Sequence, residues 1–313
     1  MLVYVVRRVI YSVIVIVGVL FTVFAVARLT PVDPVKYVLL QTGRTPGSID
    51  PVQYAQMRHQ LGLDKPILVQ FVVYVGDVLH GDFGTSIIEQ GRSVGDIMGR
   101  GIPVSAELAL MGLALQFIVG NLTGILAAAK QDSPFDRAVM SVAIVAGSVP
   151  QLVWGVVFIV IFAVQLRWLP IRGWDHPQNW ILPVLTIGIS GIAAYARFGR
   201  AVILEQARQD FVRTARAKGL QERGVLFRHI LRNALVPIVT FVGPSFAFLI
   251  TGNFVVETMF GVPGVAYYAI NSSIHGDYPV MQATVLVIAV MIMAVNLLID
   301  VLYGVIDPRI RLQ

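Results

Sequence analysis

Long apolar runs without a charged residue alternate with polar segments along this chain. Each run approaches or exceeds the ~17 to 25 residues that cross about 30 Å of hydrocarbon as a helix rising ~1.5 Å per residue. The pattern predicts an all-α integral membrane protein with six transmembrane helices, which puts both termini on the same side. The six runs lie at 9–27, 108–129, 139–166, 180–196, 234–256 and 280–299.

The spacing of these runs divides the chain into three parts. A first helix occupies 1–27, a long segment that we expect outside the cytoplasm follows at 28–105, and a core membrane domain fills 106–313. Within the outer segment, Asp50 and Pro51 are typical of a helix start and Gly62 of a helix end. Apolar residues then recur at helical spacing over 67–79, which predicts a second short helix.

The start of the chain has an alternative interpretation as a signal peptide. Arg7 and Arg8 precede an apolar run that ends in the A-x-A pattern of Ala25, Val26 and Ala27. That run is longer than the ~7 to 15 residues of a usual signal-peptide core. A retained first helix is therefore the preferred interpretation.

Lys and Arg are unevenly distributed between the predicted loops. The loops and ends on the N-terminal side are rich in them, whereas the short loops on the other side hold only Arg167 and Arg172. Because positive loops stay in the cytoplasm, we expect a multi-pass protein of the inner (cytoplasmic) membrane with both termini cytoplasmic. This bias also explains the net charge of +6, so no nucleic-acid partner is expected.

Composition agrees with a membrane location. Charged residues make up 13% of the chain, against roughly 25% in soluble domains, and 56% of residues are hydrophobic. The chain has no cysteine, which excludes thiol catalysis and cysteine metal sites. We expect no metal site.

Few polar side chains interrupt the apolar runs, and no Lys, Arg, Asp, Glu or His lies deep within one. This argues against a proton relay or an ion-coupled carrier, which rely on intramembrane ionisable groups. Amides in such runs usually hydrogen-bond between helices, but they can also line a pathway. The candidates for pathway lining are Gln116, Asn121, Gln151 and Asn296.

An enzyme is the alternative from another functional class, because Gly188 to Gly191 read G-x-S-G around Ser190. An intramembrane serine protease needs a histidine at the depth of its serine to accept the proton. All five histidines fall in predicted loops, which favours close helix packing through small residues instead. We therefore expect no catalytic residue.

A basic segment, 211–237, separates the fourth and fifth apolar runs. It lies largely in a predicted cytoplasmic loop at 197–233, because a charged residue at the centre of a membrane helix costs ~2.5 to 3.5 kcal/mol. A helix is predicted to continue from the fourth run to Lys218 and to end at Gly219. An amphipathic helix lying on the membrane should follow, with an apolar stripe formed by Leu226, Phe227, Ile230, Leu231 and Ala234.

The chain has no phosphate-binding loop of its own. None of its four lysines follows a glycine, so the G-x-x-x-x-G-K-[ST] pattern is absent. If ATP drives this protein, a partner must bind the nucleotide.

The basic segment reads R-T-A-R-A-K-G-L from Arg213 to Leu220, followed by H-x-L-R-N-A-L-x-P up to Pro237. These strings resemble the EAA loop of binding-protein-dependent ABC-transporter permeases, in the form found in the first (B-type) subunit of oligopeptide and dipeptide permeases. Arg213 and Thr214 replace the glutamate and first alanine of the general pattern. Other strings similar to this family are GLDKP at 62–66, HGDFGTS at 80–86, ETMFGVPGV at 257–265, DYPV at 277–280 and DPRIR at 307–311.

The resemblance implies a type I ABC importer permease fold of the MetI-like kind, with 106–313 as the core permease domain. It implies a permease subunit of a peptide importer that pairs with a second homologous permease, two ATPase subunits and an extracytoplasmic peptide-binding protein. ATP and Mg would be bound by the ATPases, with no cofactor in this chain. A coupling helix would dock into an ATPase cleft through Arg213, Thr214, Ala215, Lys218, Gly219 and Leu220. A nickel or glutathione importer permease is the alternative within transport.

Overall fold

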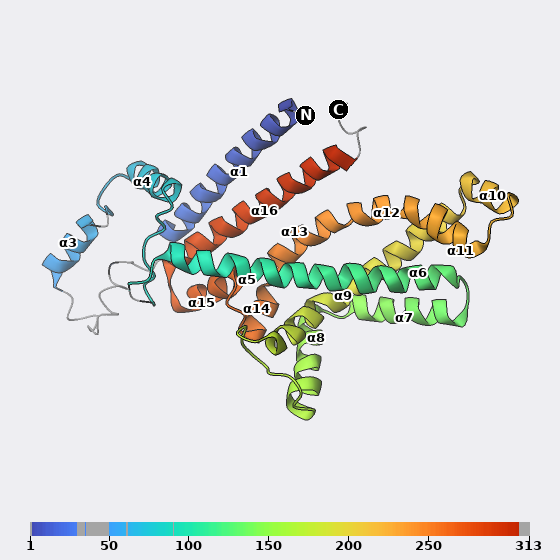
Figure 1. The fold of residues 1–313 in the computed structure, drawn as a ribbon. Helices are drawn as coiled ribbons and strands as arrows, with labels where there is room; N and C mark the ends of the chain where they lie inside the picture. The colour runs from blue at the N-terminus through green and yellow to red at the C-terminus, as the bar shows by residue number, and fades with distance from the viewer. Residues whose placement is uncertain (1, 30–34, 36–49, 61, 90, 307–313) are drawn as a thin grey trace. The chain divides into compact units, whose positions relative to one another are not determined.

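The computed structural model describes residues 2–29, 35, 50–60, 62–89 and 91–306, and these form helices with no β-strand among them (Figure 1). The chain divides into two compact units. One comprises Met1–Pro103 and Gly264–Met293, and the other Val104–Pro263 and Ala294–Gln313. The family-like string at 307–311 lies outside the described residues, as do residues 30–34 and 36–49 of the predicted outer segment.

The first unit contains the predicted outer segment. Its helices are α1 (Leu2–Leu29), α3 (Pro51–Gln60), α4 (Ile67–Leu79), the start of α5 (Val94–Leu115), α15 (Val265–His275) and most of α16 (Tyr278–Ile306). The start of α3 is confirmed, because the Asp50 Oδ1 accepts the Val52 N–H at 3.0 Å. Helix α4 packs on α1, where the Phe24 ring lies 5.4 Å from that of Phe71.

A buried carboxylate ties two family-like strings of this unit together. Asp277, which is 2% exposed, accepts hydrogen bonds from the Ser86 Oγ at 2.5 Å and from the backbone N–H groups of Ile87 and Ile88 at 3.2 and 3.3 Å. The same unit has an apolar core, formed by Val94, Ile97, Met98, Val265, Val280 and Ala283. The loop after α4 is therefore anchored to the N-terminus of α16.

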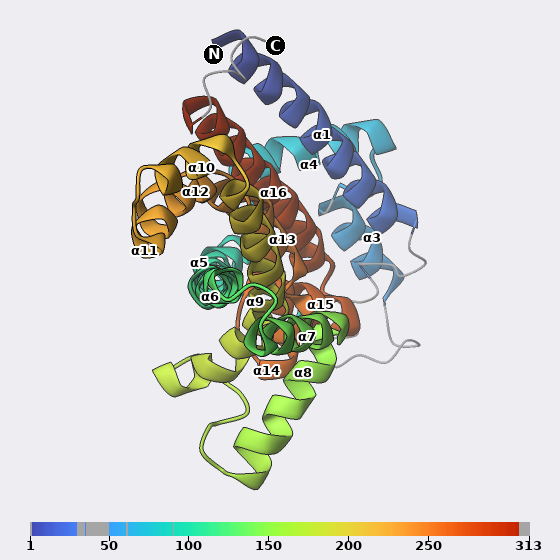
Figure 2. The same cartoon turned by 90° about the vertical axis from the view of Figure 1, so that its right-hand side faces the viewer.

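The second unit is built around the long helix α9 (Pro177–Ala207). Helices α6 (Asn121–Ala129) and α7 (Pro134–Ser148) run beside it, as Figures 1 and 2 show. Close approach depends on glycine, since a Cβ on Gly124 would lie 2.6 Å from the Ala196 carbonyl oxygen. The unit also contains η2 (Gln116–Gly120), α8 (Gln151–Phe158), η3 (Ile159–Gln165), α10 (Asp210–Ala217), α11 (Glu222–Gly224), η4 (Val225–Ile230), α12 (Leu231–Thr240), α13 (Val242–Gly252) and α14 (Phe254–Phe260).

Within the described residues, four helices are long and apolar enough to cross a membrane. The pair formed by 134–148 and 151–165 would make a fifth if taken as one bent span. The predicted number of six is not confirmed, because the apolar stretch found in α1, Val13–Val26, is shorter than a full span. The four long helices are Val94–Ala129, Pro177–Ala207, Glu222–Ile250 and Tyr278–Ile299.

The predicted third run, 139–166, is not a single straight helix. The chain bends by 101° between α7 and α8, where Val149 and Pro150 have extended ψ angles of 129° and 141°. Proline removes a helical N–H donor and disfavours helical geometry at the residue before it, so the helix ends there. The pattern of apolar residues continues through the bend, but Pro150 inside the run indicates a kink at this place.

Candidate functional sites in a basic turn and a helix-lined pocket

Residues 210–224, which include the start of the basic segment, form a compact helical turn after α9 that we call the basic turn. The predicted continuous helix to Lys218 is wrong, because α9 ends at Ala207 and α10 begins at Asp210. Between them, Gln209 has extended backbone angles (φ −71°, ψ 154°) that interrupt the helical hydrogen bonds. The break lets α10 change direction and bury Val212 and Ala215. Burial of these apolar side chains stabilises the bent arrangement relative to a straight helix, which would leave them exposed.

Helix α10 ends at Ala217, and Gly219 forms the turn that caps it, the role predicted for this glycine. The Gly219 N–H donates to the Arg216 carbonyl at 2.9 Å, and the Leu220 N–H donates to the Ala215 carbonyl at 3.4 Å. This pair of bonds is a Schellman motif, which needs a left-handed residue that glycine adopts without strain. Gly219 has φ +76° and open space around it.

Five of the six residues predicted for docking lie on the surface of this turn. Arg213, Thr214, Lys218, Gly219 and Leu220 are exposed, whereas Ala215 is 4% exposed and belongs to the core beneath. Ala215 thus anchors the turn from inside instead of contributing to its outer face. The core includes Val202, Ile203, Val212, Val225, Ile230, Ala234 and Ile238.

An ion pair closes the turn on its outer side. The Arg216 guanidinium donates to both carboxylate oxygens of Glu222, at 2.8 and 3.2 Å. The Arg213 Nη1 lies 3.6 Å from the Asp210 Oδ1, and both side chains are largely exposed. The cations of the turn therefore remain accessible on its surface.

The segment after Gly219 corrects the predicted apolar stripe. Phe227 is 63% exposed, whereas Val225 and Ile230 are buried. The residues 225–230 form a π-helix, whose i→i+5 bonding brings residues five apart onto one face. A pattern drawn at ordinary helical spacing therefore selects the wrong residue. The segment is also continuous with the helical stretch Glu222–Ile250, so it is not a separate helix.

A bidentate ion pair joins α9 to the start of α7. Arg200 Nε and Nη2 each donate to an Asp136 oxygen at 2.6 Å, and the Asp132 N–H donates to the same carboxylate at 3.0 Å. Asp136 is 2% exposed. Three residues earlier on α9, Arg197 Nη1 donates to the Ala143 carbonyl at 2.7 Å. Both arginines begin the predicted cytoplasmic loop at 197–233, and their spacing of three residues, which puts them on one helix face, is the sequence signal for this role.

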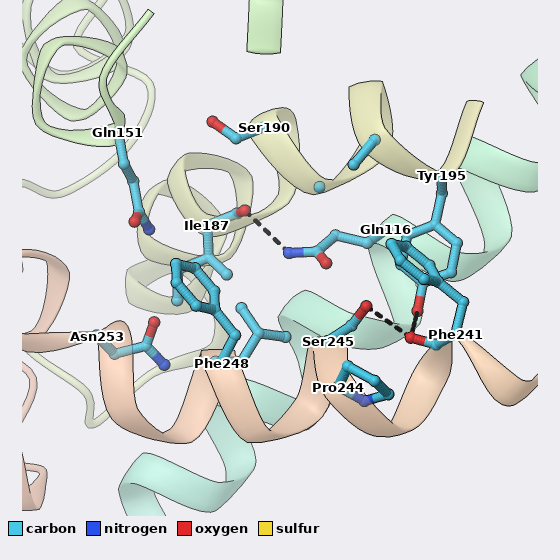
Figure 3. Close-up of a pocket in the computed structure, with 13 residues that line it drawn as sticks. Gln116, Gln151, Ile187, Ser190, Tyr195, Phe241, Pro244, Ser245, Phe248 and Asn253 are labelled. Atoms are coloured by element: carbon cyan, nitrogen blue, oxygen red, sulfur yellow. Dashed lines mark hydrogen bonds between the residues drawn. The ribbon is translucent and has the colours of Figure 1, made fainter. Parts of the chain in front are cut away.

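A pocket of about 320 Å³ lies between η2, α8, α9 and α13 of the second unit (Figure 3). None of its lining residues is charged. Of the four residues predicted to line a pathway, Gln116 and Gln151 line this pocket, whereas Asn121 is buried elsewhere and Asn296 is exposed on α16. The lining residues are Gln116, Gln151, Ile187, Ser190, Gly191, Ala194, Tyr195, Phe241, Pro244, Ser245, Phe248, Leu249 and Asn253.

The amide side chains of the pocket are held in different ways. Gln116 Nε2 donates to the Ile187 carbonyl at 3.0 Å, which fixes its orientation. Asn253 is 2% exposed, and its Nδ2 has no hydrogen-bond partner. Sequence reasoning missed Asn253, although it is an amide inside the run 234–256 and so carries the same signal as Gln116.

Ser190 also lines the pocket, but no histidine does. The two glycines of its G-x-S-G sequence lie against other helices. A Cβ on Gly188 would lie 2.5 Å from the Leu115 side chain, and one on Gly191 would overlap the Gln116 side chain. These contacts support the interpretation of the sequence as a close-packing motif.

Comparison with known proteins adds independent information. Residues 120–312 match the family described as binding-protein-dependent transport system inner membrane component, and 1–99 match the N-terminal family of such membrane components. The di/tripeptide transport system permease protein DppB of Pseudomonas aeruginosa is 35% identical over 95% of each chain. The oligopeptide permease OppB of Salmonella typhimurium is 34% identical over 92% of each chain. The glutathione permease GsiC of Salmonella choleraesuis is 38% identical over 99% of each chain.

Solved structures show the same fold. The MetNI methionine ABC transporter, in inward-facing conformations, matches 67% of this chain and 96% of its own with a TM-score of 0.57 and 16% identity. An amino acid ABC transporter matches 66% of this chain and 92% of its own with a TM-score of 0.54 and 19% identity. The described helices thus have the MetI-like permease arrangement over about two thirds of the chain.

Proposed function

The chain belongs to the family of binding-protein-dependent transport system inner membrane components, and on that premise we propose that it is the permease subunit of an ATP-driven peptide importer. The observation that carries this proposal is its identity of 34 to 35% with di/tripeptide and oligopeptide permeases over more than nine tenths of the chain. We propose six spans with both termini cytoplasmic, as the positive loops indicate.

The proposed assembly supplies what this chain lacks. A second homologous permease completes the pathway, and two ATPase subunits bind ATP and Mg. An extracytoplasmic binding protein delivers the peptide. This chain then has no ATPase site of its own, and its task is to change conformation when the ATPases close.

The basic turn is the proposed contact with the ATPase. Arg213, Thr214 and Lys218 present an exposed face, while Ala215 and Val212 join the core that α10 shares with α9 and α12. A displacement of the turn would therefore move α9 and α12 as well, because their side chains pack in the same core. The same α9 carries pocket residues at 187–195, and α13, which follows α12, supplies the opposite wall.

Gly219 offers a direct test. Proline fixes φ near −65° and cannot adopt the observed +76°, so Gly219→Pro should destroy the Schellman turn. In the reconstituted complex, peptide-stimulated ATP hydrolysis and peptide uptake should both fall about tenfold or more, since a docking loss of only ~1.4 kcal/mol has that effect.

Gly224→Ala is the matched control, because Gly224 lies in the same loop, has helical φ −64° and would accept a Cβ without contact. It should leave both activities intact. If Gly219→Pro behaves like this control, the assignment of the coupling surface is wrong.

A glutathione importer is the second candidate, favoured by the 38% identity to GsiC over 99% of each chain. Nickel import is the third. Uptake by the reconstituted complex with its own binding protein, measured with trialanine, glutathione and Ni²⁺ in competition, separates them. Ser190→Ala tests the intramembrane protease, which would lose all proteolytic activity with its nucleophile, whereas an importer needs no nucleophile at this position.

A further inference from the structure

We propose that the pocket of Gln116, Gln151 and Asn253 binds the backbone amide of an uncharged stretch of peptide during transport. This inference rests on the proposed function and adds the ligand chemistry of one site. All of the residues of this chain that line the pocket belong to its second unit.

The size of the pocket limits what it holds. Its volume of about 320 Å³ is at the lower end of the ~300 to 1,000 Å³ typical of small-molecule sites. A peptide segment of one or two residues fits this space better than an extended oligopeptide. The pocket would therefore hold successive parts of a longer substrate, not the whole of it.

The polar groups match an amide. Asn253 Nδ2 is a buried donor without a partner, which is unfavourable until an acceptor such as a peptide carbonyl reaches it. Gln116 donates through Nε2 to Ile187, so its Oε1 is left as an acceptor for a peptide N–H. Figure 3 shows the Gln116, Gln151 and Asn253 side chains entering the same space from η2, from α8 and from the turn between α13 and α14.

The remaining walls exclude charge. Ile187, Phe241, Phe248 and Leu249 supply apolar surface, and no cation or anion lines the pocket. A charged ligand group would lose its hydration there without finding a counter-ion. The site should consequently accept the backbone and neutral side chains, and reject a charged side chain.

The absence of cysteine from the chain allows a direct binding assay. Ser190→Cys places a single thiol in the pocket lining, where alkylation by a small neutral maleimide can be timed. The probe is N-acetyl-dialanine N-methylamide, applied to the purified complete complex without ATP. Its ester analogue, in which the central N–H is replaced by oxygen, has nearly the same shape and lacks that donor. Ser148→Cys, on an exposed serine outside the pocket, is the matched control.

We expect the amide probe to slow alkylation of the Ser190→Cys protein by about tenfold at ~10 times its Kd, since only the unoccupied fraction reacts. The ester analogue should bind at least about tenfold more weakly, as expected when a buried acceptor is left unpaired. The Ser148→Cys protein should show no protection. Equal protection by amide and ester, equal protection of both thiols, or no protection at all would overturn the proposal.

A second pair of variants links the effect to the amides. Gln116→Leu, combined with Ser190→Cys, should abolish protection, whereas Gln165→Leu should preserve it, because Gln165 is exposed and outside the pocket. Peptide uptake without protection would disprove this site and leave the proposed function standing. Protection without uptake of any peptide would support this site and contradict the proposed function.

Discussion

At the scale of single residues, replacing Asp136 should lower the stability of the protein more than replacing an exposed acidic residue. It is 2% exposed and accepts two bonds from Arg200 and one from the Asp132 N–H. In Asp136→Ala the Arg200 guanidinium loses its partner. The Arg200 side chain is 24% exposed in the intact pair. We expect a loss of about 2 kcal/mol in stability, below the ~3 to 5 kcal/mol of a fully buried pair, measured as a lower unfolding midpoint in detergent.

Asp210→Ala is the matched control for that prediction, because the Asp210 side chain is 96% exposed beside Arg213. Exposed pairs contribute ~0 to 1 kcal/mol, so this variant should unfold almost normally. Adding Arg200→Met to Asp136→Ala should recover part of the loss, since no unpaired cation then remains. Additive losses in this double-mutant cycle would contradict the direct coupling of the two residues.

Residue-level predictions from sequence succeeded where the chemistry is local. Asp50 at a helix start and Gly219 at a helix end are set by neighbouring backbone groups, and both are observed. Asn253 and Arg200 each carried a local signal, an amide within an apolar run and a second arginine three residues earlier, but the residues that they face lie far away in the chain. No local pattern indicates that Asp136 lies opposite Arg200, 64 residues later.

At the scale of elements, the loop 86–93 depends on a carboxylate that belongs to the turn before α16. Asp277→Ala removes the acceptor for Ser86, Ile87 and Ile88. Hydrogen bonds to a charged group contribute ~1.5 to 3 kcal/mol, so amide exchange at 87–88 should become about 10 to 100 times faster. Exchange measured by mass spectrometry on the intact protein tests this.

Asp82→Ala is a suitable comparison, because Asp82 is exposed and accepts the Gly84 N–H at 2.9 Å just before this loop. Its loss should affect exchange near Gly84 and leave 87–88 protected. Unchanged exchange at 87–88 in Asp277→Ala would show that the loop is held by other contacts.

Element boundaries show the limits of pattern reading. The apolar runs placed α9, α13 and α16 well, because burial and membrane contact both demand long apolar stretches. The bend after Ser148 and the π-helix at 225–230 change direction and phase without changing apolar content. Proline at 150 indicated a kink, but the 101° angle depends on how α7 and α8 each pack on α9.

At the scale of the whole molecule, topology is the prediction to test. Single thiols introduced by Gln56→Cys, Gln131→Cys, Asp175→Cys and Lys218→Cys can be labelled without interference, since the chain has no cysteine. In intact cells, a membrane-impermeant maleimide should label positions 56 and 175 and spare 131 and 218. This follows from the positive loops, which keep Lys130 and the basic turn in the cytoplasm.

Permeabilised cells provide the control, because all four thiols should then react. Labelling of 218 from outside, or protection of 175 in intact cells, would invert the orientation. Labelling of 56 and 131 from the same side would contradict a span between them and exclude the six-helix arrangement.

The core of the first unit joins residues 94–98 to residues 265–283, which are made much later. At ~5 to 20 residues per second, a ribosome needs about 10 to 40 s to synthesise the intervening chain. Throughout that interval Val94, Ile97 and Met98 lack Val265, Val280 and Ala283, the buried residues that complete this core. The nascent protein therefore has to keep this apolar surface from aggregating until translation is nearly finished, and a ribosome that stalls before residue 264 leaves a first unit that cannot complete its core.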